Sequence, residues 1–285
     1  MNALTELKTI TPPFELYHYT TQTGIIGVLE SDSLWATKIH YLNDLVEFKL
    51  ALSIAEEILQ EKLESCGELS NKIRCLLSNL HTIRKINICV VSLSTKRDLL
   101  SQWRAYGAKN GGFSIGFNST ALIKQAEAQG FYLVKCIYSE PEQKRLIGGL
   151  VDECLAEDFS TTQGYEDPER PRTIVMLPTG GDFTKKLISI APAIKNKSFE
   201  EESEWRLVSE NGIDIRSLSF REGASTLIPY FNLKLGEKSD YLSSVTVGPT
   251  QHLEPAKDGA TLLLGKYDFG RNCTVHETEI PFRNW

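Results

Sequence analysis

Two hydrophobic periodicities alternate along the chain, and their order constrains the fold more than any other feature of the sequence. Helix-like and strand-like segments follow one another over most of the chain, and strand-like segments dominate its end. We predict strands at residues 16–20, 33–37, 86–94, 113–117, 131–138, 204–209, 213–220, 226–235, 241–247 and 273–278. We predict helices at residues 24–30, 44–64, 68–84, 99–106, 121–129, 142–158, 183–194 and 252–264. This order indicates one α+β domain over residues 1–285, with helical insertions.

Residues 161–181 interrupt this pattern. They contain three prolines, Pro168, Pro171 and Pro178, and end in Gly180 and Gly181. Proline and glycine favour turns over regular structure, so we expect a long loop or insertion here. Loops of this length in a compact domain often act as lids.

Composition excludes several classes of protein. With 285 residues, of which 41% are hydrophobic and 24% charged, the chain resembles an ordinary soluble globular protein. A net charge of -6 argues against broad nucleic-acid binding, although a local basic patch stays possible. The six cysteines form no C-x-x-C pair and have no histidine at ligand spacing, so we expect no metal. No signal peptide or membrane-spanning apolar run occurs, and we therefore expect a cytoplasmic protein with no membrane partner.

The most informative motif lies in residues 202–208. On an extended strand, Glu202, Glu204 and Arg206 would share one face, and Trp205 and Leu207 the other. Two carboxylates this close suit chemistry on a developing positive charge, as in cleavage of a glycosidic bond. The alternative is a solvent-facing strand with a local Glu204–Arg206 pair. That alternative is weakened by the three consecutive carboxylates at residues 200–202, which repel one another unless a cation lies close.

A second motif lies near the amino terminus. In a strand at residues 16–20, His18 and Thr20 point one way, and Tyr17 and Tyr19 the other. An imidazole, a hydroxyl and aromatic rings provide partners for ribose hydroxyls and a flat heterocycle. The alternative for His18 is an ordinary core histidine that is hydrogen-bonded to a backbone carbonyl.

Two further segments carry candidate binding residues. Asp44 and Glu47 have the spacing of a capping box at a helix start, which leaves Tyr41 and Asn43 near backbone N–H groups that favour an anion such as a phosphate. Asp98 can cap the next short helix.

In that short helix, Leu99, Trp103 and Tyr106 have core spacing, and Arg104 faces elsewhere, where it can pair with a phosphate or with the carboxylates of residues 202–204. In the following strand, Gly116 indicates a bulge or room for a ligand.

Nearly the whole chain resembles an uncharacterised bacterial domain family of unknown function, many of whose members lie near mobile elements or defence genes. The matching motifs occur in the family's order: His18-Tyr19-Thr20, Tyr41-Leu42-Asn43-Asp44 with Glu47, Gln102-Trp103-Arg104 with Tyr106, Glu202-Ser203-Glu204-Trp205-Arg206, and Ile280-Pro281-Phe282-Arg283.

More distantly, the first-strand histidine and the late Glu-x-Glu strand resemble ADP-ribosyltransferases, including toxins that modify nucleic acid. That resemblance implies a mixed-sheet core and NAD as co-substrate. It implies that His18 assists binding and catalysis and that Glu204 is catalytic, or Glu202 if the register shifts. The stacking tyrosine stays open between Tyr19, Tyr41 and Tyr106, and Ser92-Leu93-Ser94-Thr95 stands where the family has Ser-Thr-Ser. The candidate NAD-binding residues are His18, Tyr19, Thr20, Tyr41, Asn43, Ser94, Trp103, Arg104, Tyr106 and Arg206.

We therefore expect an NAD-dependent ADP-ribosyltransferase-like protein, a toxin or phage-defence effector whose acceptor is a protein or nucleic acid. The alternative is a non-catalytic module of a bacterial defence system that senses a nucleotide or a partner. The sequence leaves the acceptor and the oligomeric state open.

Overall fold

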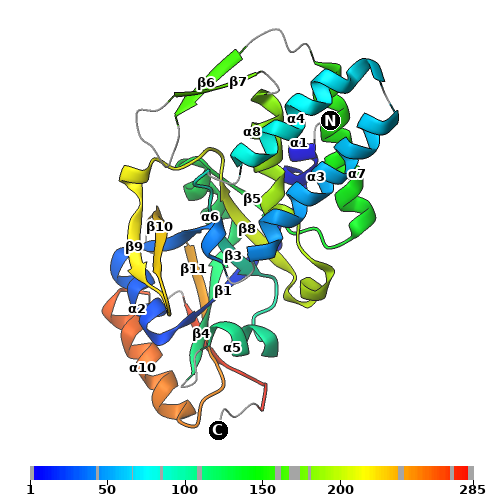
Figure 1. Cartoon of the computed structure of the whole chain (residues 1–285). Helices are drawn as coiled ribbons and strands as arrows, with labels where there is room; N and C mark the ends of the chain where they lie inside the picture. The colour runs from blue at the N-terminus through cyan, green and yellow to red at the C-terminus, as the bar shows by residue number, and fades with distance from the viewer. Residues whose placement is uncertain are drawn as a thin grey trace.

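The computed structural model describes residues 3–42, 45–65, 67–83, 86–107, 111–157, 162–166, 174–178, 181–236, 241–269 and 273–281, and these form an α+β fold (Figure 1). The α-helices are α1 (Ala3–Lys8), α2 (Gln22–Ser31), α3 (Leu45–Ser65), α4 (Ser70–Ile83), α5 (Leu100–Tyr106), α6 (Ser119–Glu127), α7 (Glu140–Ala156), α8 (Gly181–Ile190) and α10 (Leu253–Lys266). The short 3-10 helices are η1 (Ile39–Tyr41), η2 (Gly67–Leu69), η3 (Ala191–Ala193), η4 (Lys197–Glu202) and η5 (Ile215–Ser217).

The strands are β1 (Glu15–Thr21), β2 (Ser33–Lys38), β3 (Cys89–Ser94), β4 (Gly112–Asn118), β5 (Phe131–Lys135), β6 (Thr162–Glu166), β7 (Ile174–Pro178), β8 (Glu204–Ser209), β9 (Ser219–Glu222), β10 (Leu227–Lys234), β11 (Leu242–Val247) and β12 (Thr274–Glu277). The large sheet has the order β12-β11-β4-β1-β3-β2-β10-β9, with β8 and then β5 added beside β3. The β11–β12 pair is parallel, and the other pairs of this sheet are antiparallel.

The sheet splits where β1 meets β3. One edge of β3 pairs with β8 over residues 90–94. The opposite edge is shared, because β2 pairs with it at Val90 and β1 pairs with it at Ser94. Beyond its Tyr17–Ser94 pair, β1 leaves β3 and continues along β4 over its whole length. This split creates the opening in which the candidate site lies.

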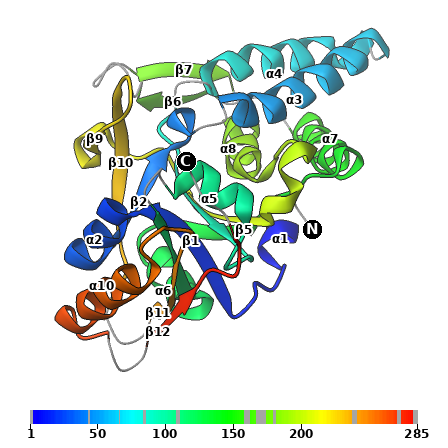
Figure 2. The same cartoon turned by 90° about the horizontal axis from the view of Figure 1, so that it is seen from below.

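Helices cover the two faces of the sheet in separate groups (Figures 1 and 2). Helices α1, α3, α4, α7 and α8 bury apolar side chains against one face, together with Val90, Val134 and Val208. Helices α2, α6 and α10 pack on the other face, together with Val91, Trp205 and Leu207. Strand β8 is therefore buried on both faces, and the solvent-facing alternative for its charged side is wrong.

Most predicted elements are confirmed within the described residues, with shifts of a few positions at their ends. Two segments differ from the prediction. Residues 213–220 are not one strand, because η5 occupies their middle and β9 begins at Ser219. The loop or insertion predicted at residues 161–181 contains two antiparallel strands, β6 and β7, which form a small separate sheet. Pro178 ends β7, whereas Pro168 and Pro171 lie outside the described residues.

Three local predictions also require comment. Asp98 is not the cap of α5: the N-cap is Leu99, and the Asp98 carboxylate instead accepts hydrogen bonds from Trp103 Nε1 and Thr278 Oγ1. Gly116 offers no room for a ligand, since a Cβ there would lie 2.3 Å from Ser244 Oγ. Asn43 and Asp44 and the side chain of Glu47 lie outside the described residues, so the capping-box interpretation stays a prediction.

None of the helices in the described part of the chain combines the length and the apolar character needed to cross a bilayer.

Candidate functional site

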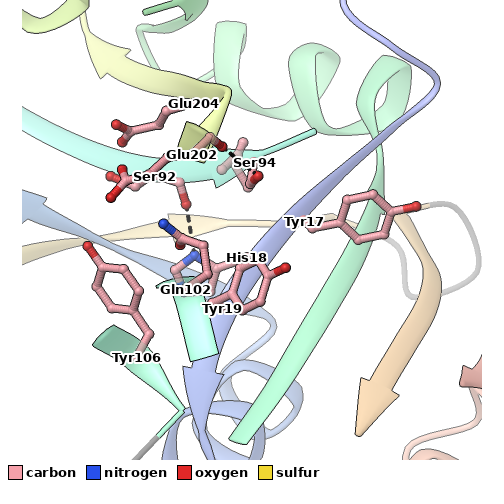
Figure 3. Close-up of a pocket in the computed structure, with 10 residues that line it drawn as sticks. Tyr17, His18, Tyr19, Ser92, Ser94, Gln102, Tyr106, Glu202 and Glu204 are labelled. Carbon is pink, nitrogen blue, oxygen red and sulfur yellow. Dashed lines mark hydrogen bonds between the residues drawn. The ribbon is translucent and has the colours of Figure 1, made fainter. Parts of the chain in front are cut away.

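A small pocket lies at the split between β1 and β3, with a cavity volume of about 60 Å³ (Figure 3). Its walls come from β1, β3, α5, the end of η4 and the start of β8. The lining residues are Tyr17, His18, Tyr19, Ser92, Leu93, Ser94, Gln102, Tyr106, Glu202 and Glu204. The histidine and the two glutamates that the sequence analysis singled out thus meet at one pocket.

His18 is fixed at the split by a backbone hydrogen bond. Its Nδ1 lies 3.0 Å from the carbonyl oxygen of Ser92, in the stretch of β3 between the β2 and β1 ladders. A carbonyl can only accept, so Nδ1 carries the proton and donates it, which leaves Nε2 as an acceptor. Burial lowers the pKa of His18, and the positive charge of Arg221 lowers this pKa further. The ring is therefore neutral near pH 7 and can accept a hydrogen bond from a hydroxyl.

Tyrosine side chains form the aromatic part of the pocket. Tyr19 packs edge-on against Trp103 with ring centroids 4.7 Å apart, and its hydroxyl accepts from the N–H of Leu99 just before α5. Tyr106 extends from α5 toward the pocket from the side opposite Glu202 (Figure 3). Burial raises the pKa of Tyr106, and the negative charges of Glu204 and Glu202 raise it further, which places the phenol close to both carboxylates.

Glu204 belongs to a buried ion cluster. Arg206 donates from Nε to Oε1 of Glu204 at 2.8 Å and from Nη2 to Oε2 at 3.0 Å, and Lys195 Nζ donates to the same Oε2. The side chains of Glu204, Arg206 and Lys195 are 5%, 2% and 5% exposed. Burial alone would raise the pKa of Glu204, but the charges and hydrogen bonds of Arg206 and Lys195 outweigh burial and lower the pKa to about 2. Glu204 is an ionised carboxylate whose two oxygens both accept from cations.

Glu202 lies beside Glu204 but not on the same strand. It ends η4, and Ser203 follows in the left-handed region at φ 46°, so β8 begins only at Glu204. The predicted alternation of Glu202 and Glu204 on one strand is therefore wrong, because the chain turns between them. Lys195 Nζ donates to Glu202 Oε2 as well, and this lysine is the cation that the acidic run requires. The Glu202 side chain is 15% exposed, three times the value for Glu204.

The backbone of Lys195 is held in place by two neighbouring segments. Its N–H donates to the Ile137 carbonyl at 3.0 Å, and its own carbonyl accepts from Gln143 Nε2 of α7 at 2.7 Å. The ammonium also lies 5.1 Å from the centroid of the Phe199 ring. Lys195 thus joins the helical layer to the two carboxylates of the pocket.

Of the predicted site residues, the structure brings His18, Tyr19, Ser94, Tyr106, Glu202 and Glu204 to the pocket. The others do not line it, for identifiable reasons. Thr20 packs on α2, where a Cβ on Gly24 would lie 1.8 Å from its Oγ1, and Trp103 packs behind Tyr19. Arg206 lies behind Glu204 rather than at the pocket surface.

Two more predicted residues lie away from the lining, and one cannot be placed. Arg104 is exposed on α5, and Tyr41 is 39% exposed at the end of η1. Neither belongs to the lining residues. Asn43 lies outside the described residues.

The sequence analysis missed Tyr17, Ser92, Leu93 and Gln102 as lining residues, and Lys195 as the partner of both carboxylates. For Gln102 a signal existed, because it stands one residue before the predicted core residue Trp103 and so on a neighbouring part of the helix surface. For Lys195 none existed, since its contacts depend on tertiary structure.

Within the described part of the chain, no group of three or more His, Cys, Asp or Glu side chains is arranged to hold a metal ion.

Residues 102–207 match the family model "Protein of unknown function (DUF2971)". The matched segment runs from α5 to β8 and contains Lys195, Glu202, Glu204 and Arg206, whereas β1 with His18 lies outside it. Comparison with the curated proteins and with the solved structures gives no match.

Proposed function

We propose that the pocket at the β1–β3 split binds NAD and catalyses ADP-ribosyl transfer, as the resemblance to ADP-ribosyltransferases implies. The observation that carries this proposal is the meeting of His18 with Glu202 and Glu204 at one pocket, next to tyrosine rings. In the reaction, the bond between ribose and nicotinamide breaks, and its electron pair leaves with nicotinamide. The acceptor then forms a bond to the same ribose carbon and loses a proton.

The contacts support separate roles for these groups. His18 presents Nε2 as an acceptor for a ribose hydroxyl, because its Nδ1 proton is held by Ser92. Tyr106 and Tyr19 offer ring faces or edges to the nicotinamide. The carboxylates supply negative charge to the oxocarbenium-like transition state, where fixed charges act without reorganisation. The proposed acceptor is a protein or a nucleic acid, and the proposed biological role is that of a toxin or phage-defence effector.

We assign contact with the ribose to Glu202 rather than Glu204. Both oxygens of Glu204 already accept hydrogen bonds from Arg206 and Lys195. Glu202 is the more exposed of the two, at 15% against 5% for the side chain. Glu204 then acts through Lys195, as a positioning residue.

The test is release of nicotinamide from NAD by the purified protein, with and without candidate protein and nucleic-acid acceptors. We expect release by the wild type and at least about 100-fold slower release by Glu202→Gln, the scale of losing one preorganised electrostatic contact. Glu201→Gln is the matched control, because Glu201 is exposed on the same 3-10 helix and does not line the pocket. Release by Glu202→Gln at the wild-type rate would remove Glu202 from the mechanism.

A second candidate function is a non-catalytic module that senses a nucleotide. The pairing of Glu204 with two cations favours it, since the charge of this carboxylate is already neutralised by Lys195 and Arg206. Tight binding of NAD without release of nicotinamide, under all acceptor conditions, would support the sensor over the transferase.

A further inference from the structure

Arg221 is a partly buried cation with few partners. It lies on β9, and its Nε is buried without a hydrogen-bond partner. Its Nη2 lies 3.5 Å from Thr37 Oγ1, a long contact, and its guanidinium carbon lies 5.9 Å from the centroid of the Trp35 ring. No carboxylate pairs with it among the described residues.

The ladder registers place Arg221 on the same sheet face as the acids of the pocket. Residues opposite one another in a ladder share a face, and so do residues two apart along one strand. Arg221 pairs with Ile228, and Tyr230, two residues along β10, pairs with Thr37 of β2. Thr37 in turn pairs with Val90 of β3, so Arg221, Tyr230, Thr37 and Val90 share one face of the sheet.

The same face continues along β3 into the pocket. Ser92 lies two residues beyond Val90, roughly 7 Å farther along the strand. Ser92 is opposite Arg206, and Ser94 is opposite Glu204. After burial, the positive charge of Arg221 also contributes to the lowered pKa of His18. We call this row of residues, from the carboxylates through Ser92, Val90 and Thr37 to Arg221, the lane; Val90 and Thr37 in its middle are buried, at 1% and 7% exposed, so only its two ends are open to a ligand.

A partly buried arginine without a counter-ion lowers the stability of the folded chain, and an anion that binds to the arginine would restore that stability. Burial lowers the pKa of Arg221, as expected for a guanidinium that loses water without gaining a counter-ion. Its planar fork matches a phosphate in two parallel hydrogen bonds, and Trp35 lies against the guanidinium and restricts its orientation.

We propose that Arg221, Thr37 and Trp35 form a phosphoryl-binding subsite at the far end of this lane. The inference rests on the proposed function for the identity of the ligand, in which the subsite takes the diphosphate of a dinucleotide. The pocket beside His18 encloses about 60 Å³, below the range of about 300–1,000 Å³ that is typical of ligand sites, so most of a dinucleotide would lie outside it. Arg221, at the far end of the lane, offers that remainder a positive charge complementary to the diphosphate.

The experiment measures binding of ADP-ribose and of inorganic pyrophosphate by calorimetry at fixed salt concentration. We expect Arg221→Gln to weaken both by about 10- to 100-fold, the range for hydrogen bonds to charged groups. Arg221→Lys keeps the charge but loses the fork, and we expect an intermediate affinity. Arg216→Gln is the matched control: it removes one positive charge five positions earlier, from a side chain that is 79% exposed, and should leave both affinities unchanged.

Three outcomes would overturn the subsite: the wild type binds neither probe, Arg221→Gln binds both within about twofold of the wild type, or Arg216→Gln weakens binding equally. A measurement on the wild type alone covers the case in which the variants fail to fold. Bound pyrophosphate should protect Arg221, identified by mass spectrometry, from a dicarbonyl reagent, and equal modification with and without pyrophosphate would overturn the subsite.

The subsite and the transferase can fail separately. Arg221-dependent binding of ADP-ribose without release of nicotinamide would preserve the subsite and end the transferase proposal. Release of nicotinamide with an unchanged KM for NAD in Arg221→Gln would preserve the transferase proposal and end the subsite.

Discussion

Replacement of Glu204 by Gln tests the ion cluster most directly, because the amide keeps the shape of the side chain and removes its charge. Arg206 and Lys195 would then be buried cations, 2% and 5% exposed, with Glu202 as the remaining acid of the cluster. Removing one partner from a buried ion pair typically costs about 3–5 kcal/mol of folding free energy. Since whole domains are stable by only about 5–15 kcal/mol, the variant would lose a large part of its stability.

The lowered pKa of Glu204 reflects the same stabilisation of its charged form by Arg206 and Lys195. Folding lowers this pKa from 4.5 to about 2. At about 1.4 kcal/mol per pKa unit, the difference corresponds to about 3 kcal/mol. Because the folded pKa lies below the unfolded one, this stability is fully present above pH 4.5 and is lost as the pH falls toward 2.

The assay is urea unfolding of the wild type, Glu204→Gln and the exposed control Glu201→Gln, at pH 7 and at several values down to pH 3. We expect a loss of about 3–5 kcal/mol for Glu204→Gln at pH 7, a loss that shrinks below pH 4.5, and a change below about 0.5 kcal/mol for the control. A loss below about 1 kcal/mol at pH 7, or one that does not change with pH, would refute the reasoning. If the prediction holds, lost activity in Glu204→Gln cannot by itself identify Glu204 as catalytic, and Glu202→Gln is the cleaner variant.

Three more predictions concern single side chains. Lys195→Met should destabilise the protein by about 1–3 kcal/mol in urea unfolding, less than Glu204→Gln, because Arg206 still pairs with Glu204; a neutral result would contradict the bridging role of Lys195. Arg221→Met should leave the ligand-free unfolding temperature unchanged or raise it, because it removes a partly buried charge that no described carboxylate neutralises; a clear fall would indicate a structural partner. Gly116→Ala should cost about 1–3 kcal/mol, since the new Cβ would lie 2.3 Å from Ser244 Oγ and 3.0 Å from Tyr17 Cε1. In Gly149→Ala on α7, the new Cβ meets nothing within 4 Å, so this control should be neutral or stabilising in the same unfolding assay.

Local periodicity explains which parts of the fold and site were predictable from the sequence. The strands with His18 and Glu204 were found because aromatic or apolar side chains alternate along them, Tyr17 with Tyr19 and Trp205 with Leu207, and of these Tyr19, Trp205 and Leu207 are indeed buried. The turn at Ser203 escaped prediction because a left-handed serine has no sequence signature, and this one residue takes Glu202 off the strand. Residues 213–220 were misassigned because isolated apolar residues such as Ile215, which is 43% exposed, resemble a strand pattern.

The rest of the site depends on contacts between distant segments. Lys195 reaches the carboxylates because Gln143 of α7 and Ile137 fix its backbone. Arg221 lies on the same face of the sheet as the acids of the pocket because of the pairing between successive strands. No local pattern encodes such contacts, and the split of β1 from β3 is likewise a property of the whole sheet.

The charges at the two ends of the lane also set an orientation for the proposed ligand. At one end, the charges of Glu202, Glu204, Lys195 and Arg206 sum to zero, so this cluster attracts no anion from a distance, while Glu202 is the charged member most open to the pocket. At the other end, Arg221 carries a positive charge that no described carboxylate balances. NAD has the complementary polarity, with a cationic nicotinamide ring and an anionic diphosphate. The ring would therefore lie at Glu202 and the diphosphate at Arg221, with His18 between them at the ribose, so that Arg221→Gln should raise KM and Glu202→Gln should lower kcat.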